Sequence, residues 1–289
     1  MKKMFSIVVS LLLVSAVLFS FTSCHKDGVY TPKKKISRIY TQISGQAKML
    51  TEQWTWKDNL LSKIDYYYNG TYSHTNRYQY DGKQLTEVLI EEGKIRFTYD
   101  GSKLEKMEMW FSGSLFWKAK VTHEGNKIVE IEFTEYDVYT VMKSSRSSAY
   151  DALKGVLPES SCAHIAELSK KRAAKSAKTG VEVWNLYYTY DGNNIKEERY
   201  VVSGEEDKYT YTYDKELNPF FNLLVGGQSY SDYEFSKNNI INVVYTNNYD
   251  GDYAETEFSY VYEKSYPVER TTYYVTGNSF GVTDYYEYE

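Results

Sequence analysis

Hydrophobic and polar residues alternate strictly over short stretches of this chain. Ile95, Phe97 and Tyr99 share one face of such a stretch, and the charged or hydroxyl side chains between them share the other. The same period of two runs over residues 129–134. This spacing predicts β-strands that turn one face to the core and the other to water.

An internal repeat organises these strands. Its pattern is an aromatic or apolar residue, any residue, an aromatic residue, an acid, Gly, two polar residues, and then Leu or Ile. The clear copies are YQYDGKQL (78–85), FTYDGSKL (97–104), VTHEGNKI (121–128) and YTYDGNNI (188–195), and looser copies are WTWKDNLL (54–61), YTYDKELN (211–218), YEFSKNNI (233–240) and YVYEKSYP (260–267). Because Asp-Gly favours a tight turn and residues two apart share a strand face, each copy predicts the tip of a β-hairpin.

The spacing of the repeats predicts the topology. Asp81 and Asp100 are 19 residues apart, which leaves room for two strands and a second turn between successive tips. We therefore expect an all-β fold, a long antiparallel up-and-down meander of about sixteen short strands over residues 36–289. Because twist accumulates and long edges aggregate, the sheet should curl into a barrel-like or two-layer arrangement.

One interval, from Asp137 to Gly180, lacks the repeat. It is rich in Ser, Ala, Lys and Arg, which predicts an inserted helical excursion at about residues 146–178. Its basic residues outnumber its acidic ones. A patch for anionic glycans or lipid headgroups is one interpretation, and a solvated helical face beside an acidic sheet is the interpretation we prefer.

The N-terminal segment predicts export. Lys2 and Lys3 precede a long apolar run, as in a secretory signal peptide, which we place at residues 1–23. Small residues directly before Cys24 resemble the lipobox of bacterial lipoproteins, so we expect cleavage before Cys24 and lipidation of that cysteine. An uncleaved membrane anchor or an ordinary signal peptide is the alternative. Residues 24–35 are predicted to form a lipidated tether that is too charged to pack in a core.

The residues after Cys24 bear on location. His25, Lys26 and Asp27 resemble the export signal that sends lipoproteins of Bacteroides-type bacteria to the outer face of the outer membrane, with one acidic residue where richer signals have more. The resemblance implies an outer-membrane lipoprotein exposed at the cell surface, and the periplasmic face is the alternative. Once Cys24 carries lipid, Cys162 has no partner for an intramolecular disulfide.

Composition agrees with a folded β protein. The chain holds 32 Tyr, 12 Phe and 5 Trp, 17% of its residues, whereas disordered chains have few aromatics. Charged residues make up 25%, which argues against a helical membrane protein. The formal net charge of −5 and the predicted export argue against nucleic acid as a partner.

The repeats carry a family resemblance. The YxYDG units resemble the tyrosine-aspartate (YD) repeats of Rhs-type proteins, and the array from about Ile36 onward resembles secreted lipoproteins of Bacteroides-type bacteria that have a porin-like β fold and no assigned activity. The segments that carry the second resemblance are YDKELNPFFNLL (213–224), SKNNIINVVY (236–245) and YVYEKSYPVERTTY (260–273), where Glu263 and Lys264 replace the usual turn. The resemblance implies a fold and a location but no activity.

A true outer-membrane pore is an alternative that we disfavour. Membrane barrels need strands of about 9–11 residues with one wholly apolar face. The predicted strands are shorter, and charges occur on both faces of several, as in IKEERY (195–200). A lipid anchor would also be redundant for a protein that spans the membrane.

The residues offer little catalytic chemistry. The four histidines, His25, His74, His123 and His164, show no spacing typical of a metal site, and Cys162 with His164 is a weak nucleophile-base pair because residues two apart on a helix face away from each other. Asp250, Asp252 and Glu255 suit Ca²⁺, but a polar hairpin tip explains them better. We expect no enzyme activity, no metal and no cofactor.

Two functions remain. The first is a non-catalytic binding module at the cell surface, with glycans as the candidate ligands, because exposed aromatic rings stack on sugar faces. The candidate ligand-binding residues are Trp54, Trp56, Tyr66, Tyr67 and Tyr68. The alternative is a structural or assembly component of the outer envelope that docks a partner protein. Exposure of the aromatic cluster on a concave surface would favour the first.

Overall fold

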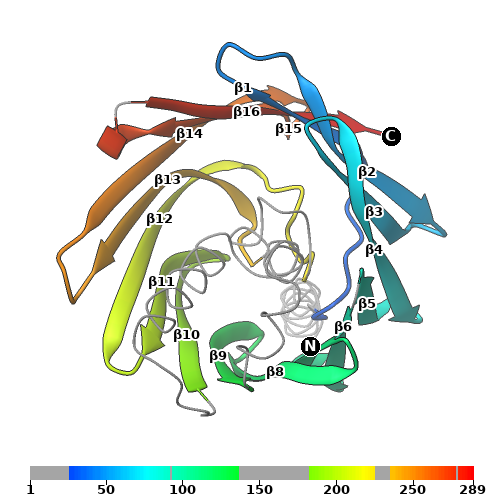
Figure 1. Cartoon of the computed structure of the whole chain (residues 1–289), viewed down its shortest axis with the longest axis vertical. Coiled ribbons are helices and arrows are strands. Elements are labelled where there is room, and N and C mark those ends of the chain that lie inside the picture. The colour runs from blue at the N-terminus through cyan, green and yellow to red at the C-terminus, as the bar shows by residue number, and fades with distance from the viewer. Residues whose placement is uncertain (1–25, 92, 137–181, 225–234, 278) are drawn as a thin grey trace, which may run out of the picture.

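A computed structural model describes residues 26–91, 93–136, 182–224, 235–277 and 279–289. In it the chain forms one closed barrel of sixteen antiparallel strands, with each strand paired to its neighbours in sequence and β1 paired to β16 (Figure 1). The strands are β1 (Ile36–Ile43), β2 (Met49–Lys57), β3 (Leu60–Tyr68), β4 (Thr71–Asp81), β5 (Gln84–Ile90), β6 (Gly93–Asp100), β7 (Lys103–Phe111), β8 (Ser114–Glu124), β9 (Lys127–Glu135), β10 (Glu182–Asp191), β11 (Asn194–Val202), β12 (Glu205–Leu217), β13 (Asn238–Asn247), β14 (Tyr253–Glu263), β15 (Tyr266–Tyr274) and β16 (Ser279–Tyr288), and a short 3₁₀ helix, η2 (Val275–Gly277), precedes β16.

The predicted sixteen-strand meander is confirmed, and of the two expected arrangements the sheet adopts the barrel. The predicted helical excursion at residues 146–178 lies outside the described residues. Among the described residues, no helix is long and apolar enough to cross a membrane.

The repeats form the hairpin tips at one end of the barrel. Asp81 ends β4, Gly82 takes a positive φ of 59°, and Leu85 lies at the start of β5. Gly101 likewise takes a positive φ, of 60°, in the turn between β6 and β7. Because residues with a side chain avoid this backbone region, glycine fixes the place where each tight turn forms.

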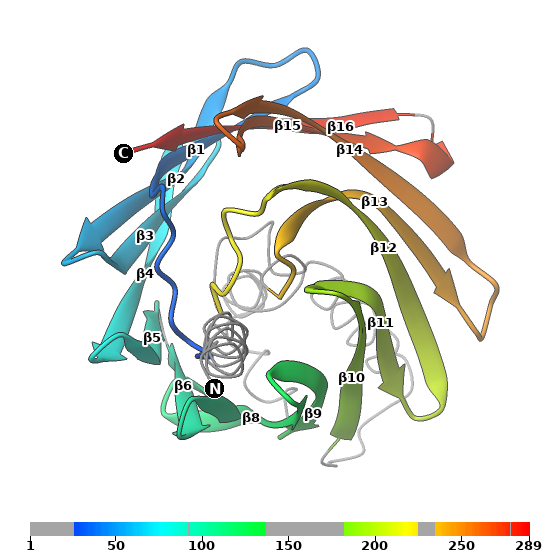
Figure 2. The same cartoon turned by 180° about the vertical axis from the view of Figure 1, so that it is seen from behind.

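Alternation along the strands sorts side chains between an apolar interior and a polar outer wall. In β8 the side chains of Trp117 and Val121 are buried inside, whereas Lys118 and Lys120 are exposed outside. Figure 1 and Figure 2 view the ring of strands from its two ends.

The outer wall is charged in its middle. On β5 and β6, the Glu87 carboxylate contacts Arg96 Nε at 2.9 Å and Lys94 Nζ at 3.4 Å. The expectation that the strands are too short for a membrane barrel is wrong, since they have 7 to 13 residues. The expectation of charge on the wall holds, and a charged outer wall around an apolar interior is the reverse of the arrangement in lipid-facing barrels.

The second aromatic residue of the repeat links neighbouring hairpins. The Tyr99 hydroxyl donates a hydrogen bond to the Leu85 carbonyl at 2.6 Å. The same kind of bond joins Tyr190 to Ile128 and joins Tyr288, which lies outside the eight copies, to Pro267, each at 2.8 Å. In these three bonds the acceptor is the last position of a copy of the repeat, so the repeat supplies a turn and, at these places, an attachment to the neighbouring hairpin.

Asp27, Gly28 and Tyr30 of the N-terminal segment are buried inside the barrel, which corrects the expectation that residues 24–35 are too charged to pack in a core. Asp27 and Tyr30 are 6% and 4% exposed. The Asp27 amide donates to the Ser102 carbonyl, the Leu85 amide donates to the Gly28 carbonyl, and Tyr30 Oη donates to the Pro219 carbonyl at 2.6 Å. The lysines in the sequence suggested a solvated segment, but the backbone hydrogen bonds and the buried ring of Tyr30 hold the segment inside the barrel.

A second segment, residues 218–224, enters the same end of the barrel after β12 (Figure 2). Its Phe220 ring lies 6.2 Å from the ring of Trp54 and 6.1 Å from that of Tyr286, between centroids. We call the end that carries the Asp-Gly turns and these two segments the plugged end. The opposite end, with described turns at residues 44–48, 69–70, 91, 112–113, 203–204, 248–252 and 275–277, is the far rim.

Gly28→Ala tests the packing of the N-terminal segment. A Cβ at Gly28, where φ is 70°, would overlap the Tyr99 hydroxyl that is already bonded to Leu85. Gly45→Ala is the control, because its φ is 79° but its surroundings are open. We expect Gly28→Ala to lower the free energy of unfolding by about 2–3 kcal/mol more than Gly45→Ala, measured by denaturant titration. Equal losses would contradict the packed arrangement.

Candidate functional site

Three of the five aromatic residues predicted to bind a ligand lie inside the barrel. Trp54 is 4% exposed, and its indole N–H donates to Glu52 Oε2 at 2.8 Å. Trp56 Nε1 donates to the Ile36 carbonyl at 2.7 Å. The ring of Tyr66, which is 1% exposed, stacks on the ring of His74 at 4.6 Å. These rings have structural partners on the inner wall.

The other two residues lie where β3 ends. Tyr68 is 75% exposed, and the ring of Tyr67 makes an edge contact with the ring of Tyr72 at 6.1 Å. The five residues are therefore divided between the interior and the far rim and do not form one surface. The predicted lipidation site, Cys24, lies outside the described residues, as does Cys162.

A buried ion pair joins two strands in the interior. Arg270 on β15 and Asp284 on β16 are directly opposite each other and are 5% and 2% exposed. The Arg270 Nη2 and Asp284 Oδ2 atoms are 2.7 Å apart, and the Thr41 hydroxyl on β1 donates to Asp284 Oδ1 at 2.7 Å. The pair thus ties together three strands beside the β1–β16 closure.

Glu52 extends this cluster on β2. Burial raises the pKa of Glu52 to about 8, and the negative charge of Asp284 adds to the rise. The hydrogen bond from Trp54 and the positive charge of Arg270 oppose the shift without cancelling it. Glu52 is therefore a neutral acid at pH 7, which lets an acidic side chain lie in an apolar wall.

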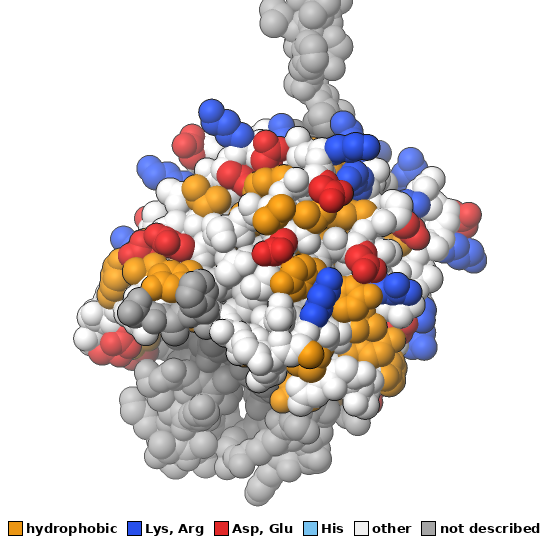
Figure 3. Space-filling model, turned by 90° about the horizontal axis from the view of Figure 1, so that it is seen from above, with side chains coloured by type: hydrophobic (Ala, Val, Ile, Leu, Met, Phe, Trp, Pro, Cys, Tyr) orange, Lys and Arg blue, Asp and Glu red, His pale blue; other side chains and the backbone are white. Residues whose placement is uncertain are grey.

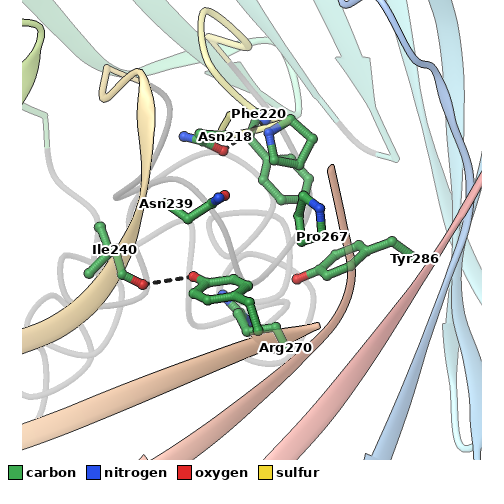
Figure 4. Close-up of a pocket in the computed structure, with 9 residues that line it drawn as sticks. Asn218, Phe220, Asn239, Ile240, Pro267, Arg270 and Tyr286 are labelled. Carbon is green, nitrogen blue, oxygen red and sulfur yellow. Dashed lines mark hydrogen bonds between the residues drawn. The ribbon is translucent and has the colours of Figure 1, made fainter. Parts of the chain in front are cut away.

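A small pocket adjoins the ion pair. Its wall is formed by Asn218, Pro219, Phe220, Asn239, Ile240, Tyr260, Pro267, Arg270 and Tyr286 (Figure 4). The space that a water-sized molecule can enter is about 10 Å³, close to the minimum for one ordered water. The pocket as it stands is too small for an organic ligand.

Asp27 and His123 form an unexpected contact at the plugged end. His123 occupies the repeat position that is tyrosine in the other clear copies. Its Nε2 atom lies 2.8 Å from Asp27 Oδ2, which also accepts the Leu104 amide at 2.7 Å. The repeat thus loses its tyrosine at a point where the N-terminal segment docks. Departure of His123 from the motif was the signal in the sequence that could have revealed this contact.

The far rim carries the exposed aromatic residues. Every tyrosine that is exposed among the described residues lies there, and these are Tyr68 at 75%, Tyr72 at 56%, Tyr253 at 51%, Tyr274 at 46% and Tyr249 at 36%. Figure 3, which views the barrel wall from the side of β14, β15 and β16, shows hydrophobic side chains in separate groups among charged ones. Sequence reasoning missed four of these tyrosines because their positions lie outside the repeat motif.

The β13–β14 turn supplies polar groups beside this rim. Asn247 Oδ1 accepts the amides of Gly251 and Asp252 at 2.9 and 3.1 Å, so the loop closes on itself as the hairpin interpretation predicted. The Tyr253 hydroxyl donates to Glu255 Oε2 at 2.7 Å, which fixes the direction of its ring. In the part of the chain that the structure describes, no cluster of His, Cys, Asp and Glu could hold a metal ion.

The raised pKa of Glu52 predicts a pH-dependent stability. Unfolding returns the pKa to about 4.5, so the stability that protonated Glu52 contributes is complete below about pH 4.5 and is lost as the pH rises to about 8. Glu52→Gln keeps a neutral acceptor for Trp54 and should remove up to about 4–5 kcal/mol of this dependence. Denaturant titrations from pH 5 to 8 measure how the free energy of unfolding changes with pH. Glu257→Gln is the control, because Glu257 is exposed. Parallel curves for the parent and Glu52→Gln would refute it.

Comparison with known proteins identifies the fold. No family model matches the chain, and no curated protein matches it. It is similar to the crystal structure of a porin-like protein from Bacteroides vulgatus, with a TM-score of 0.51, 11% identity, and coverage of 89% of this chain and 99% of the other. It is also similar to a porin-like protein from Bacteroides uniformis, with a TM-score of 0.50, 9% identity, and coverage of 88% and 98%. At these identities the comparisons show a porin-like β fold.

Proposed function

We propose that this protein is a lipid-anchored, surface-exposed protein of the outer membrane that binds glycans through the far rim without catalysing a reaction. The observation that carries the proposal is the separation of the two ends. The N-terminal segment enters at the plugged end, and the exposed tyrosines gather at the other. A lipid at Cys24 would therefore hold the binding surface away from the membrane.

The position of Asp27 supports the end-on arrangement. Its carboxylate is held by the Leu104 amide and by His123, so the chain is fixed to the barrel at this residue. Three residues of chain span at most about 10 Å, which limits the distance from Asp27 to a lipid on Cys24. A rigid, short connection would orient the barrel, whereas a long tether would leave it free to turn.

The far rim has the chemistry that sugar recognition needs. Tyrosine rings stack on the apolar faces of sugars, and amide or carboxylate groups fix the orientation of the hydroxyls. Tyr253 and Tyr274 supply exposed rings, and Asp250 and Asp252 supply exposed carboxylates in the neighbouring turn. The Tyr253–Glu255 hydrogen bond preorganises one ring and lowers the entropy lost on binding.

A partner protein is the second candidate for the same rim. Val183 and Val275 are also exposed there, at 48% and 37%. Aliphatic side chains do not stack on sugars but do anchor protein interfaces. This observation favours docking of another envelope protein if glycans fail to bind.

Cys24→Ala tests the anchor. With the acylated cysteine removed, we expect loss of fatty-acid labelling, with the protein either released from the membrane fraction or retained as an uncleaved precursor. Fractionation with metabolic palmitate labelling measures both. Absence of label in the parent protein would refute lipidation.

Paired tyrosine variants test the binding surface. We expect Tyr253→Ala and Tyr274→Ala each to weaken glycan binding about tenfold while leaving the melting temperature within about 2 °C, because the removed rings are exposed. The control is Val261→Ala, since Val261 is 52% exposed but lies on the β14 wall. A glycan array followed by calorimetry measures binding. Trp54→Ala is unsuitable as a test, because it would empty part of the core.

No retention of any glycan by the parent protein would refute the sugar hypothesis. Capture of an envelope protein that Tyr253→Ala abolishes would then support docking instead. Equal loss of glycan binding in Val261→Ala would show that the rim is not the site.

A further inference from the structure

The exposed tyrosines of the far rim differ in what their hydroxyl groups contact. The Tyr249 hydroxyl donates to Asp207 Oδ1 at 3.1 Å, but Asp207 is 2% exposed, so a ligand on the Tyr249 ring does not reach that carboxylate. The Tyr253 hydroxyl donates to Glu255 Oε2 at 2.7 Å, and Glu255 is only partly buried. Because residues two apart share a strand face, the Tyr253 ring and the Glu255 carboxylate open onto the same side of β14.

The Glu255 carboxylate is held from both sides. Its other oxygen, Oε1, accepts a hydrogen bond from Asn242 Nδ2 on β13 at 2.8 Å. The hydrogen bonds from Tyr253 and Asn242 lower the pKa of Glu255 below its ordinary value, so this carboxyl group is ionised at neutral pH. An ionised carboxylate has about four acceptor positions, and these two donors take one position on each oxygen. Glu255 can therefore accept further hydrogen bonds from a ligand on the solvent side.

Thr276 adds a hydrogen-bond donor beside the carboxylate. Its Oγ1 atom accepts the Glu255 amide at 2.7 Å, which places η2 against β14. Because a hydroxyl group accepts and donates at the same time, the Thr276 proton can be donated to an acceptor on a ligand. Thr276 is exposed. The far rim at β14 thus presents a ring face, a fixed carboxylate and a hydroxyl donor close together.

This combination matches the functional groups of an uncharged sugar. The apolar face of a sugar ring stacks on tyrosine, and each sugar hydroxyl both donates and accepts. Two adjacent hydroxyls can donate to the two oxygens of one carboxylate, and hydrogen bonds to an ionised acceptor are stronger than neutral ones. A sugar acid is disfavoured at the same place, because two negative charges about 4 Å apart in water weaken binding about fivefold.

We propose that Glu255 is the specificity-determining residue of the far rim and that it selects neutral glycans with two adjacent hydroxyl groups. The inference rests on the proposed function, since it names the class of glycan that the far rim binds. Tyr253 supplies a ring contact that any sugar can use. Glu255 supplies the contacts that depend on the substituents of the sugar, so a sugar that lacks these hydroxyls, or carries a carboxylate beside them, loses affinity.

An array of matched glycans tests this selection. It holds linear oligosaccharides of glucose, galactose, mannose and xylose, each beside a counterpart in which one sugar is replaced by a uronic acid. The mature chain from residue 24, with Cys24→Ser, is compared with the same chain carrying Glu255→Gln or Glu257→Gln, and calorimetry gives the dissociation constants. Glu257 is exposed two residues farther along the same face of β14, so Glu257→Gln removes the same charge and leaves the Glu255 acceptor in place.

We expect the parent to bind neutral members of the array at least about fivefold more tightly than their uronic acid counterparts. Glu255→Gln should weaken binding of the neutral sugars about tenfold and bring the two members of each pair within about twofold of each other. Glu257→Gln should change either value less than about twofold, because exposed charges that do not touch the ligand are screened. Melting temperatures within about 2 °C of the parent value show that the variants are folded.

Equal effects of the two substitutions would show that only net charge matters and would overturn the role of Glu255. Tighter binding of the uronic acid members by the parent would overturn the neutral class. Loss of binding in Tyr253→Ala without any change in Glu255→Gln would refute this inference and leave the proposed function intact. Failure of the parent to bind any member of the array would refute the glycan function itself.

Discussion

Closure of the sheet is the constraint on which the rest of this structure depends. Sixteen strands in sequence order leave two edges, and pairing of β1 with β16 satisfies both. The buried Arg270–Asp284 pair and the Thr41 hydroxyl lie beside this seam and join its strands through side chains as well. Tyrosines of the repeats, such as Tyr99 on Leu85 and Tyr190 on Ile128, then fasten some neighbouring hairpins to one another.

A closed ring of this size needs material inside it. The described interior is filled at one end by residues 27–30 and 218–224, with Tyr30 bonded to Pro219 and Phe220 packed against Trp54. Aromatic side chains suit this role because each covers a large area and Tyr and Trp also donate a hydrogen bond. The abundance of tyrosine therefore has a structural cause first, and a binding function concerns only the exposed rings.

The plugged end and the far rim are suited to different tasks. At the plugged end, short turns and a fixed N-terminal segment favour attachment. At the far rim, Tyr253, Tyr274 and the acidic β13–β14 turn favour recognition of a partner. The charged outer wall between them, with pairs such as Glu87 and Arg96, suits water rather than lipid.

The sequence by itself determined the strands, their number and their order. Period-two alternation and Asp-Gly turns depend only on residues that are close together in the chain, so they can be recognised without the tertiary structure. Only the tertiary structure decided which aromatic residues are buried. Trp54 and Tyr68 belong to adjacent strands and look equivalent in the sequence, yet one faces Phe220 and the other is 75% exposed. The contacts that decide this join residues far apart in the chain, as Asp27 and His123 are, or Tyr30 and Pro219. Such contacts depend on how the sheet curves and closes, and a local pattern carries no information about that.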